Sequence, residues 1–232
     1  MRLLTFLPGT PLALLNPFPK GLVHELGRFL ARFSKSFADF QHPSLIRTFR
    51  WDMTQLLTLR PYLADLVSSR ETLILREFER FERLTKPALA QVPQAALHND
   101  ANDHNLLVGQ PNGACRFGII DFGDMIQGPR ICELAIATTY LMLGREAPAE
   151  LAKTLIQAYQ EVFPLERNEL DCLVPAIRAR LCASILISSH DQKREPGNEY
   201  VSISREPAWR LFEFLDSPEG QSFESDLLKI IA

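Results

Sequence analysis

The sequence predicts a mainly α fold of the α+β class, because helical periodicity runs through most of the chain while sheet signals are few. Apolar residues fall at helical spacing over 20–37, and the pattern Ser68 to Glu71 resembles a capping box that opens a second long helix reaching Leu89. After Ile131, proline and glycine residues separate further helices, expected at 131–143, 147–163, 167–192, 206–215 and 219–231.

The one clear sheet signal is a β-hairpin in the middle of the chain. The apolar run LLVG and the alternating run ACRFGIID flank the turn sequence QPNG. Asn112-Gly113 is a dipeptide typical of two-residue hairpin turns, so we expect it at the tip. The numbers of paired residues then add up to 225, which places Asn105 opposite Ile120 and beside Asp121.

Composition narrows the class of protein. The chain has 232 residues, of which 46% are hydrophobic and 23% charged, and this usage is typical of a globular protein. A formal net charge of -3 gives no electrostatic footprint for nucleic acid. No apolar run reaches the ~20 residues that cross a bilayer, and the opening segment lacks a signal-peptide cleavage pattern. We therefore expect a cytoplasmic protein that binds neither nucleic acid nor membrane.

The cysteines predict neither a disulfide framework nor a metal site. They lie far apart, without a C-x-x-C pair or a histidine at zinc spacing, at Cys115, Cys132, Cys172 and Cys182. We expect buried, reduced thiols.

A cluster of oxygen ligands carries the chemical signal. Between positions 100 and 124 the chain gathers acids and amides: Asp100, Asn102, Asp103, Asn105, Asp121 and Asp124. The hairpin register brings the Asn105 amide and the Asp121 carboxylate together, and such ligands suit Mg²⁺. Asp100 would stand just outside that site, where a carboxylate can take a proton from a hydroxyl and orient it toward phosphorus. The alternatives are a polar loop without chemistry and a zinc site built from His98, Asp100 and His104.

Two motifs in this window resemble those of the protein-kinase-like fold. They are His98-Asn99-Asp100 with Asn105, and Ile120-Asp121-Phe122-Gly123-Asp124. With Asn99 in place of arginine, and with Glu133-Leu134-Ala135 following, the chain is more similar to the aminoglycoside phosphotransferase and choline kinase superfamily. Within it, HNDANDHNLLV and GIIDFGDM resemble hydroxylysine kinases and the phosphotransferase modules fused to bacterial aminotransferases.

The resemblance implies a role for each motif residue. Asp100 would be the catalytic base, and His98 would brace the catalytic loop. Asn105 and Asp121 would be the Mg²⁺ ligands. The phosphoryl donor would be ATP or GTP, whose base would meet the hinge backbone at Leu4, Thr5, Phe6 and Leu7.

The resemblance also implies the domain organisation. Residues 1–232 would form a single phosphotransferase domain, with a hinge strand at 1–7 and a protein-kinase-like, helical carboxy-terminal lobe over 8–232. The nucleotide-covering amino-terminal lobe is expected to be absent, because no glycine-rich loop precedes Gly9 and the first lysine is Lys20. The hinge strand would then be an apolar edge prone to self-association or to pairing with another chain.

The expected function is transfer of the nucleotide γ-phosphoryl group to a hydroxyl of an amino alcohol such as 5-hydroxylysine. Alternative acceptors are choline or ethanolamine, homoserine and aminoglycosides. A non-catalytic binding module is an alternative from another class. Substrate class rests on the resemblance alone.

Several further side chains have open interpretations. Trp51 and Asp52 form an aromatic and acidic pair suited to a cationic amine, although a tryptophan that anchors two helices is the alternative. Asp124 either faces the metal or an amine, or is an exposed loop acid. Glu133 is expected to cap backbone N–H groups and to steady the loop after Asp121. Arg178 and Arg180 either bind a substrate carboxylate or form a charged stripe on a long helix.

Overall fold

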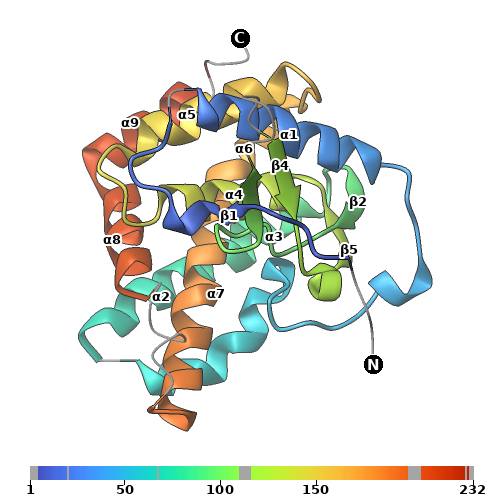
Figure 1. Cartoon of the computed structure of the whole chain (residues 1–232). Coiled ribbons are helices and arrows are strands. Elements are labelled where there is room, and N and C mark those ends of the chain that lie inside the picture. The colour runs from blue at the N-terminus through green and yellow to red at the C-terminus, as the bar shows by residue number, and fades with distance from the viewer. Residues whose placement is uncertain are drawn as a thin grey trace.

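Helices build most of the protein, as the periodicity predicts (Figure 1). The computed structural model describes residues 5–19, 21–66, 68–109, 116–197, 205–227 and 229. The α-helices are α1 (Leu22–Ser36), α2 (Ser68–Arg80), α3 (Lys86–Leu89), α4 (Ile131–Met142), α5 (Pro148–Gln160), α6 (Arg167–Asp171), α7 (Leu173–Arg194), α8 (Arg205–Asp216) and α9 (Pro218–Leu227). A π-helical turn, Phe81–Thr85, joins α2 to α3, so the helix expected from Ser68 to Leu89 is confirmed. The capping role of the Ser68 side chain lies outside the described residues.

Two parts of the structure differ from the predicted helices. The segment expected as one helix over 167–192 is divided at Cys172 into α6 and α7. The short α6 begins with a capping box, in which the Glu166 N–H donates to the Glu169 carboxylate at 2.9 Å. A long 3₁₀ segment, Met53–Asp65, was not predicted, and it packs along α7.

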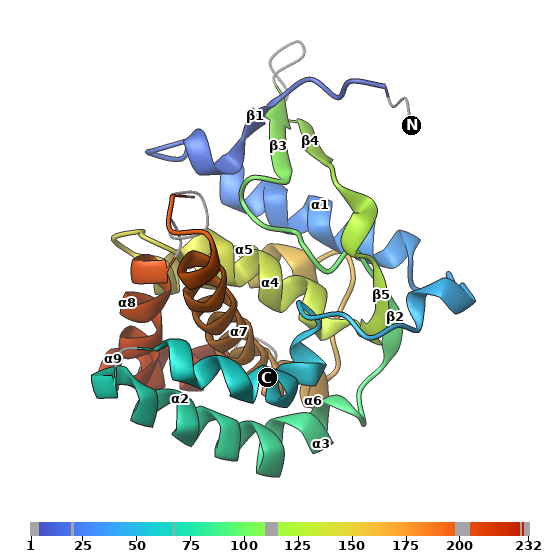
Figure 2. The ribbon, with the colours of Figure 1, turned by 90° about the horizontal axis from the view of Figure 1, so that it is seen from below.

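The core lies around α4 and α7. Nearly every residue of α4 is buried, and α7 is buried from Leu173 through Ser189 on almost all sides. The long α7 passes through the helical body, with α8 beside it (Figure 2). On the other flank α1 packs along α5, where a Cβ at Gly27 would collide with the carbonyl oxygen of Leu155. This glycine therefore allows the close approach of the two helices.

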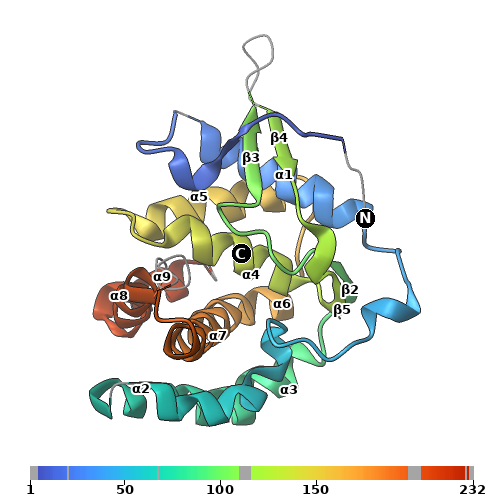
Figure 3. The same ribbon diagram turned by 60° about the horizontal axis from the view of Figure 1, so that its bottom comes forward.

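Two small antiparallel sheets flank the segments that carry the two motifs, 98–105 and 120–124 (Figure 3). The first has the order β1-β3-β4, from Thr10–Pro11, Leu106–Gly109 and Arg116–Ile119. Leu106 pairs with Ile119, and the Ile120 N–H donates to the Asn105 carbonyl at 3.1 Å, so the predicted register is confirmed. The Asn112-Gly113 tip lies outside the described residues.

The second sheet corrects the expectation that the hairpin is the only clear sheet element. It pairs β2 (Gln94–Leu97) with β5 (Ile126–Pro129). Neither strand has a distinctive pattern, since QAAL reads equally well as helix and IQGP contains a glycine and a proline. Their pairing spans a long sequence separation and depends on the fold around them.

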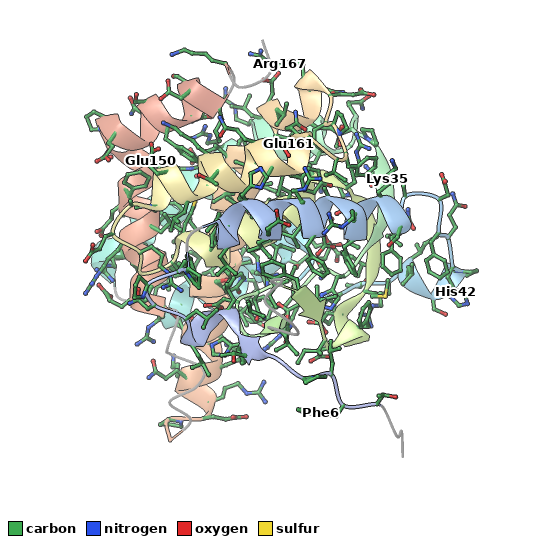
Figure 4. All side chains as sticks on the ribbon, turned by 45° about the horizontal axis from the view of Figure 1, so that its top comes forward. Phe6, Lys35, His42, Glu150, Glu161 and Arg167 are labelled. Atoms are coloured by element: carbon green, nitrogen blue, oxygen red, sulfur yellow. The ribbon has the colours of Figure 1, made fainter. Side chains whose placement is uncertain are left out.

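The amino-terminal strand also differs from its prediction. Residues 5–9 form no regular element, and the strand begins only at Thr10, which pairs with Val108. The Leu7 side chain instead packs over Gly118, and Pro8 has no N–H to donate to a ladder. Phe6 is 84% exposed and points away from the body (Figure 4). Self-association through this segment stays a prediction.

Among the described helices, none combines the length and the apolar character that crossing a membrane requires. Three of the cysteines are buried free thiols, as expected: Cys132, Cys172 and Cys182. Cys115 lies outside the described residues.

Candidate active site

The loop between β2 and β3 carries the first motif and is anchored at its start by His98. This side chain is buried, and its Nε2 lies 2.9 Å from the carbonyl oxygen of Ile120. Its Nδ1 accepts the backbone N–H of Asp100 at 3.3 Å, so we assign the neutral tautomer with the proton on Nε2. Burial lowers the pKa of His98, which favours that neutral form. His98 therefore ties the loop to the residue preceding Asp121.

A second anchor comes from Glu133 in the first turn of α4. Its Oε2 accepts the backbone N–H groups of His98 at 2.6 Å and Asn99 at 3.3 Å. Asn99 adopts a left-handed conformation with φ 66°, which turns the chain sharply before Asp100. Burial raises the pKa of Glu133 to about 7. The predicted capping role is thus seen, but the loop that Glu133 steadies precedes Asp100 instead of following Asp121.

Asp100 is held on both carboxylate oxygens. Oδ1 accepts Arg180 Nη2 at 3.0 Å, while Oδ2 accepts Asn105 Nδ2 at 2.7 Å and Asn102 Nδ2 at 3.0 Å. The side chain remains 21% exposed. Its direction is therefore fixed while one edge stays open to solvent, as a proton acceptor for a bound molecule requires.

Arg180 was not predicted as a buried partner of Asp100. The side chain is 1% exposed, and besides Asp100 it donates to Tyr140 Oη at 3.2 Å and to the Trp51 carbonyl at 3.3 Å. Its guanidinium lies over the rings of Trp51 and Tyr140, at 4.8 and 5.3 Å from their centroids. The charged-stripe interpretation is wrong, because both arginines are buried and this part of α7 is buried on almost all sides. An arginine within such a helix signals a buried, paired cation.

Arg178 is buried too, but it faces the helical body. It donates to Glu77 at 2.8 Å and to Asp216 at 2.6 Å, which join α7 to α2 and α8. No part of this network lines the cleft beside Asp100. Arg178 is therefore a structural residue.

Asn105 and Asp121 lie at the same end of the hairpin, just before β3 and two residues after the end of β4. Asn105 uses its amide nitrogen for Asp100, which leaves the amide oxygen available. Asp121 is exposed, adopts φ 65°, and accepts only the weak N–H bond of Gly123 at 3.3 Å among the interactions of the described residues. One amide oxygen and one carboxylate fit Mg²⁺. Their shared ligation of a metal stays a prediction.

The zinc alternative finds no support. Nowhere in the described part of the chain do three histidine, cysteine or carboxylate side chains converge in a way that could hold a metal. Both ring nitrogens of His98 are already hydrogen-bonded, to the Ile120 carbonyl and to the Asp100 N–H, so neither is available to a metal.

A cleft of about 440 Å³ opens beside Asp100. Trp51 and Asp124 both line it, and Asp124 is half-buried, so the interpretation of Asp124 as an exposed loop acid is wrong. Burial raises the pKa of Asp124, and the nearby charges of Asp100 and Asp121 raise it further. A bound cation would relieve this crowding of negative charge.

Asp52 does not contribute to the cleft. It is buried, and its carboxylate caps the 3₁₀ segment by accepting Thr54 N at 2.9 Å and Gln55 Nε2 at 2.9 Å. Trp51 lines the cleft but Asp52 does not, so the prediction that the two side chains together hold an amine is wrong. A short acidic side chain just before a helical segment is typical of a cap, and that signal was present in the sequence.

The described hinge residues lie apart from this cleft. Leu4 is outside the described residues, while Thr5, Phe6 and Leu7 are exposed. Leu7 lines a second hollow of about 820 Å³ together with Val108 and Phe117. Contact of this segment with a nucleotide base stays a prediction.

Comparison with known proteins decides the family. The model of the phosphotransferase enzyme family matches residues 1–171, which include both motifs and the Glu133 anchor. The chain belongs to that phosphotransferase family. The resemblance inferred from the motifs at 98–105 and 120–124 is therefore confirmed.

Curated relatives of this chain include hydroxylysine kinases. The protein from Bos taurus is 29% identical over 222 residues, covering 90% of this chain and 59% of the relative. The protein from Danio rerio is 30% identical over 213 residues, covering 88% of this chain and 59% of the relative. The chain thus spans less than two thirds of the length of these relatives.

Solved structures confirm the fold of this chain. A microcompartment-associated aminopropanol kinase has a TM-score of 0.63 at 20% identity, with 85% of this chain and 63% of that chain covered. A choline/ethanolamine kinase family protein from Mesorhizobium loti has a TM-score of 0.63 at 16% identity, with 90% and 68% covered. The predicted mainly helical, kinase-like architecture is confirmed.

Proposed function

We propose that this chain carries the phosphoryl-transfer site of a small-molecule kinase, with ATP or GTP as donor and 5-hydroxylysine as acceptor. The observation that carries the proposal is the Asp100 carboxylate, which lines the cleft, is fixed by Arg180 and Asn105, and stays partly open. Membership of the phosphotransferase family and similarity to hydroxylysine kinases support the reaction and the acceptor.

The reaction needs a base that receives one proton. The acceptor hydroxyl oxygen would form a bond to the γ-phosphorus while the bond from that phosphorus to the bridging β–γ oxygen breaks, releasing the nucleoside diphosphate. Asp100 would take the hydroxyl proton on a carboxylate oxygen and later release it to solvent. Because Asn102, Asn105 and Arg180 fix the carboxylate, the hydroxyl is oriented before the transfer begins.

Asn105 and Asp121 would hold Mg²⁺, since an amide oxygen and a carboxylate suit this ion and the hydrogen bonds of the two side chains leave oxygens available. When bound, Mg²⁺ neutralises negative charge on the phosphate oxygens. The Asn105 amide nitrogen meanwhile keeps its bonds to Asp100, so one side chain couples the metal position to the base.

The cleft also favours an acceptor with an ammonium group. Asp124 lines it with a half-buried carboxylate in a negative surrounding, and the Trp51 ring offers an apolar wall. Choline, ethanolamine, homoserine and aminoglycosides are the alternative acceptors. A non-catalytic binding module would use the same cleft without turnover.

The proposal is tested by phosphoryl transfer to a panel of hydroxyl compounds, with the longest expressed form of the protein that contains residues 1–232. The panel is 5-hydroxy-L-lysine, choline, ethanolamine, homoserine and an aminoglycoside, each with Mg²⁺ and either ATP or GTP. We expect the highest kcat/KM for 5-hydroxy-L-lysine. Preference for another acceptor would correct the substrate, and binding without transfer to any of them would favour the non-catalytic module.

A further inference from the structure

A second charged pair lines the same cleft, away from the catalytic loop. Arg50, in the loop that precedes the 3₁₀ segment, donates from Nη1 to Asp191 Oδ1 on α7 at 3.0 Å, and its Nη2 donates to Oδ2. The Arg50 side chain is 42% exposed and that of Asp191 is 23% exposed. A ligand in the cleft can therefore reach both members of the pair.

One face of α7 joins this pair to the catalytic loop. Arg180, Ser184, Ser188 and Asp191 recur at helical spacing, so they lie on one side of the helix, and all four line the cleft. Trp51 contacts both ends of this face. The centroid of its ring lies 4.8 Å from the guanidinium of Arg180 and 5.8 Å from that of Arg50. The cleft thus runs from the Asp100 carboxylate to the Arg50–Asp191 pair.

The charges along the cleft are complementary to an amino acid. Two of the described guanidinium groups line the cleft. Arg180 is 1% exposed and Arg50 is 42% exposed, so Arg50 is the one that a ligand carboxylate can reach. The carboxyl group of Asp124 lines the same cleft as Asp100, where it could meet a second, side-chain ammonium group of the ligand. An exposed ion pair stabilises a fold by only about 0–1 kcal/mol, so stability alone gives little reason for this pair.

We propose that Arg50 and Asp191 form the binding site for the α-amino acid head group of the acceptor, with the carboxylate on Arg50 and the α-ammonium on Asp191. An α-amino acid carries its two opposite charges on one carbon, and it would lie antiparallel to the Arg50–Asp191 pair, matching each charge with its opposite. The side chain would extend along α7 and bring its hydroxyl to Asp100. This inference rests on the proposed function and names the groups that select the acceptor.

The test compares two acceptors that differ by one group. 5-Hydroxy-L-lysine carries the α-carboxylate, whereas 1,5-diaminopentan-2-ol keeps both amines and the hydroxyl but lacks it. For Arg50→Gln we expect the KM for 5-hydroxy-L-lysine to rise about 10- to 100-fold, the loss of one charge-assisted contact, with kcat nearly unchanged. The KM for 1,5-diaminopentan-2-ol should stay within about threefold. An equal change for both acceptors, or no change for either, would overturn the proposal.

Two further variants sharpen the comparison. Asp191→Asn should raise the KM for both acceptors, because both retain the α-amine. Arg28→Gln is the matched control, since Arg28 forms a similarly exposed pair with Glu161, at 2.6 Å, on the α1 and α5 flank away from the cleft. It should change neither KM.

A binding measurement separates this inference from the proposed function. L-Lysine lacks the hydroxyl and cannot accept a phosphoryl group, so calorimetric titration needs no turnover. We expect L-lysine to bind the wild-type protein and Arg28→Gln alike, and Arg50→Gln about 10-fold or more weakly. Absence of transfer to 5-hydroxy-L-lysine with this binding pattern retained would contradict the function alone. Equal binding of L-lysine to Arg50→Gln and wild type, or no binding to either, would contradict the head-group site.

Discussion

Arg178 and Arg180 lie two residues apart on α7 and are both buried, but their side chains have different roles. Arg178 faces the helical body and joins Glu77 to Asp216. Arg180 faces the cleft, where it holds the Asp100 carboxylate and packs against Trp51 and Tyr140. The difference shows that burial and residue type do not identify a functional arginine. The decisive feature is whether the arginine and its partner line the cleft, as Arg180 and Asp100 do.

The largest expected effect is on stability, from Arg178→Met. Glu77 would then be left buried without its cation, and such a loss costs about 3–5 kcal/mol. Chemical denaturation of the variant should show this decrease in the free energy of unfolding, while KM at a temperature where the variant is folded stays unchanged. The double variant Arg178→Met with Glu77→Met should regain part of the loss. If Arg178→Met were as stable as the wild type, the structural role assigned to Arg178 would be contradicted.

Arg180→Met should show the converse pattern. We expect kcat to fall about 10-fold or more, because Asp100 loses the donor that fixes one oxygen. The cost in stability should be smaller than for Arg178→Met, since Asp100 is partly solvated. Paired measurements of kcat and of the unfolding free energy for both methionine variants test the contrast. Equal kcat losses in the two variants would contradict it.

A smaller effect is expected from the titration of Glu133. Burial raises the pKa of Glu133 from its ordinary value of 4.5 to about 7. Between pH 4.5 and pH 7 the folded state therefore keeps a proton on Glu133 that the unfolded state has lost. The stability contributed by the protonated form is therefore present at low pH and is lost as pH rises through that window. In Glu133→Gln the free energy of unfolding should fall less steeply with pH over that range. The control is Glu150→Gln, on the exposed surface of α5. Parallel curves for wild type and Glu133→Gln would contradict the assignment.

The smallest expected effect on transfer is that of Asp124→Asn. Asp124 would meet an ammonium group and touches neither the proton nor the phosphoryl group. We expect a KM increase of about 3- to 10-fold for 5-hydroxy-L-lysine, with kcat little changed. A kcat loss without a change in KM would place Asp124 at the metal instead of the acceptor.

Local patterns explain which parts of the fold could be predicted from the sequence. The Asn-Gly turn and the alternation after it specified the hairpin register, so the neighbouring positions of Asn105 and Asp121 followed from counting. The helices were predicted because apolar spacing repeats along each one. The pairing of β2 with β5 and the start of β1 at Thr10 depend on contacts distant in sequence, and short strands without alternation do not reveal them.

The site divides in the same way. Asp100 and His98 could be located from the sequence because their motif is local. The contacts of His98 agree with its expected role of bracing the loop, whereas the role of Asp100 as base stays a prediction. Arg180 comes from a helix eighty residues later, so its bond to Asp100 could not be inferred from spacing. Asp52 was misjudged because a helix cap and a ligand carboxylate look alike in sequence. The two are told apart only by which N–H groups the oxygens meet.

The central claim is that Asp100 is the base of phosphoryl transfer, and Asp100→Asn tests it most directly. Asparagine keeps the size of the side chain and an oxygen for Arg180, but it cannot take the hydroxyl proton. With 5-hydroxy-L-lysine, Mg²⁺ and the preferred nucleotide, we predict a fall in kcat of about 10²-fold or more, while nucleotide affinity, measured by calorimetry, stays nearly unchanged. Turnover close to that of the wild type would contradict the account.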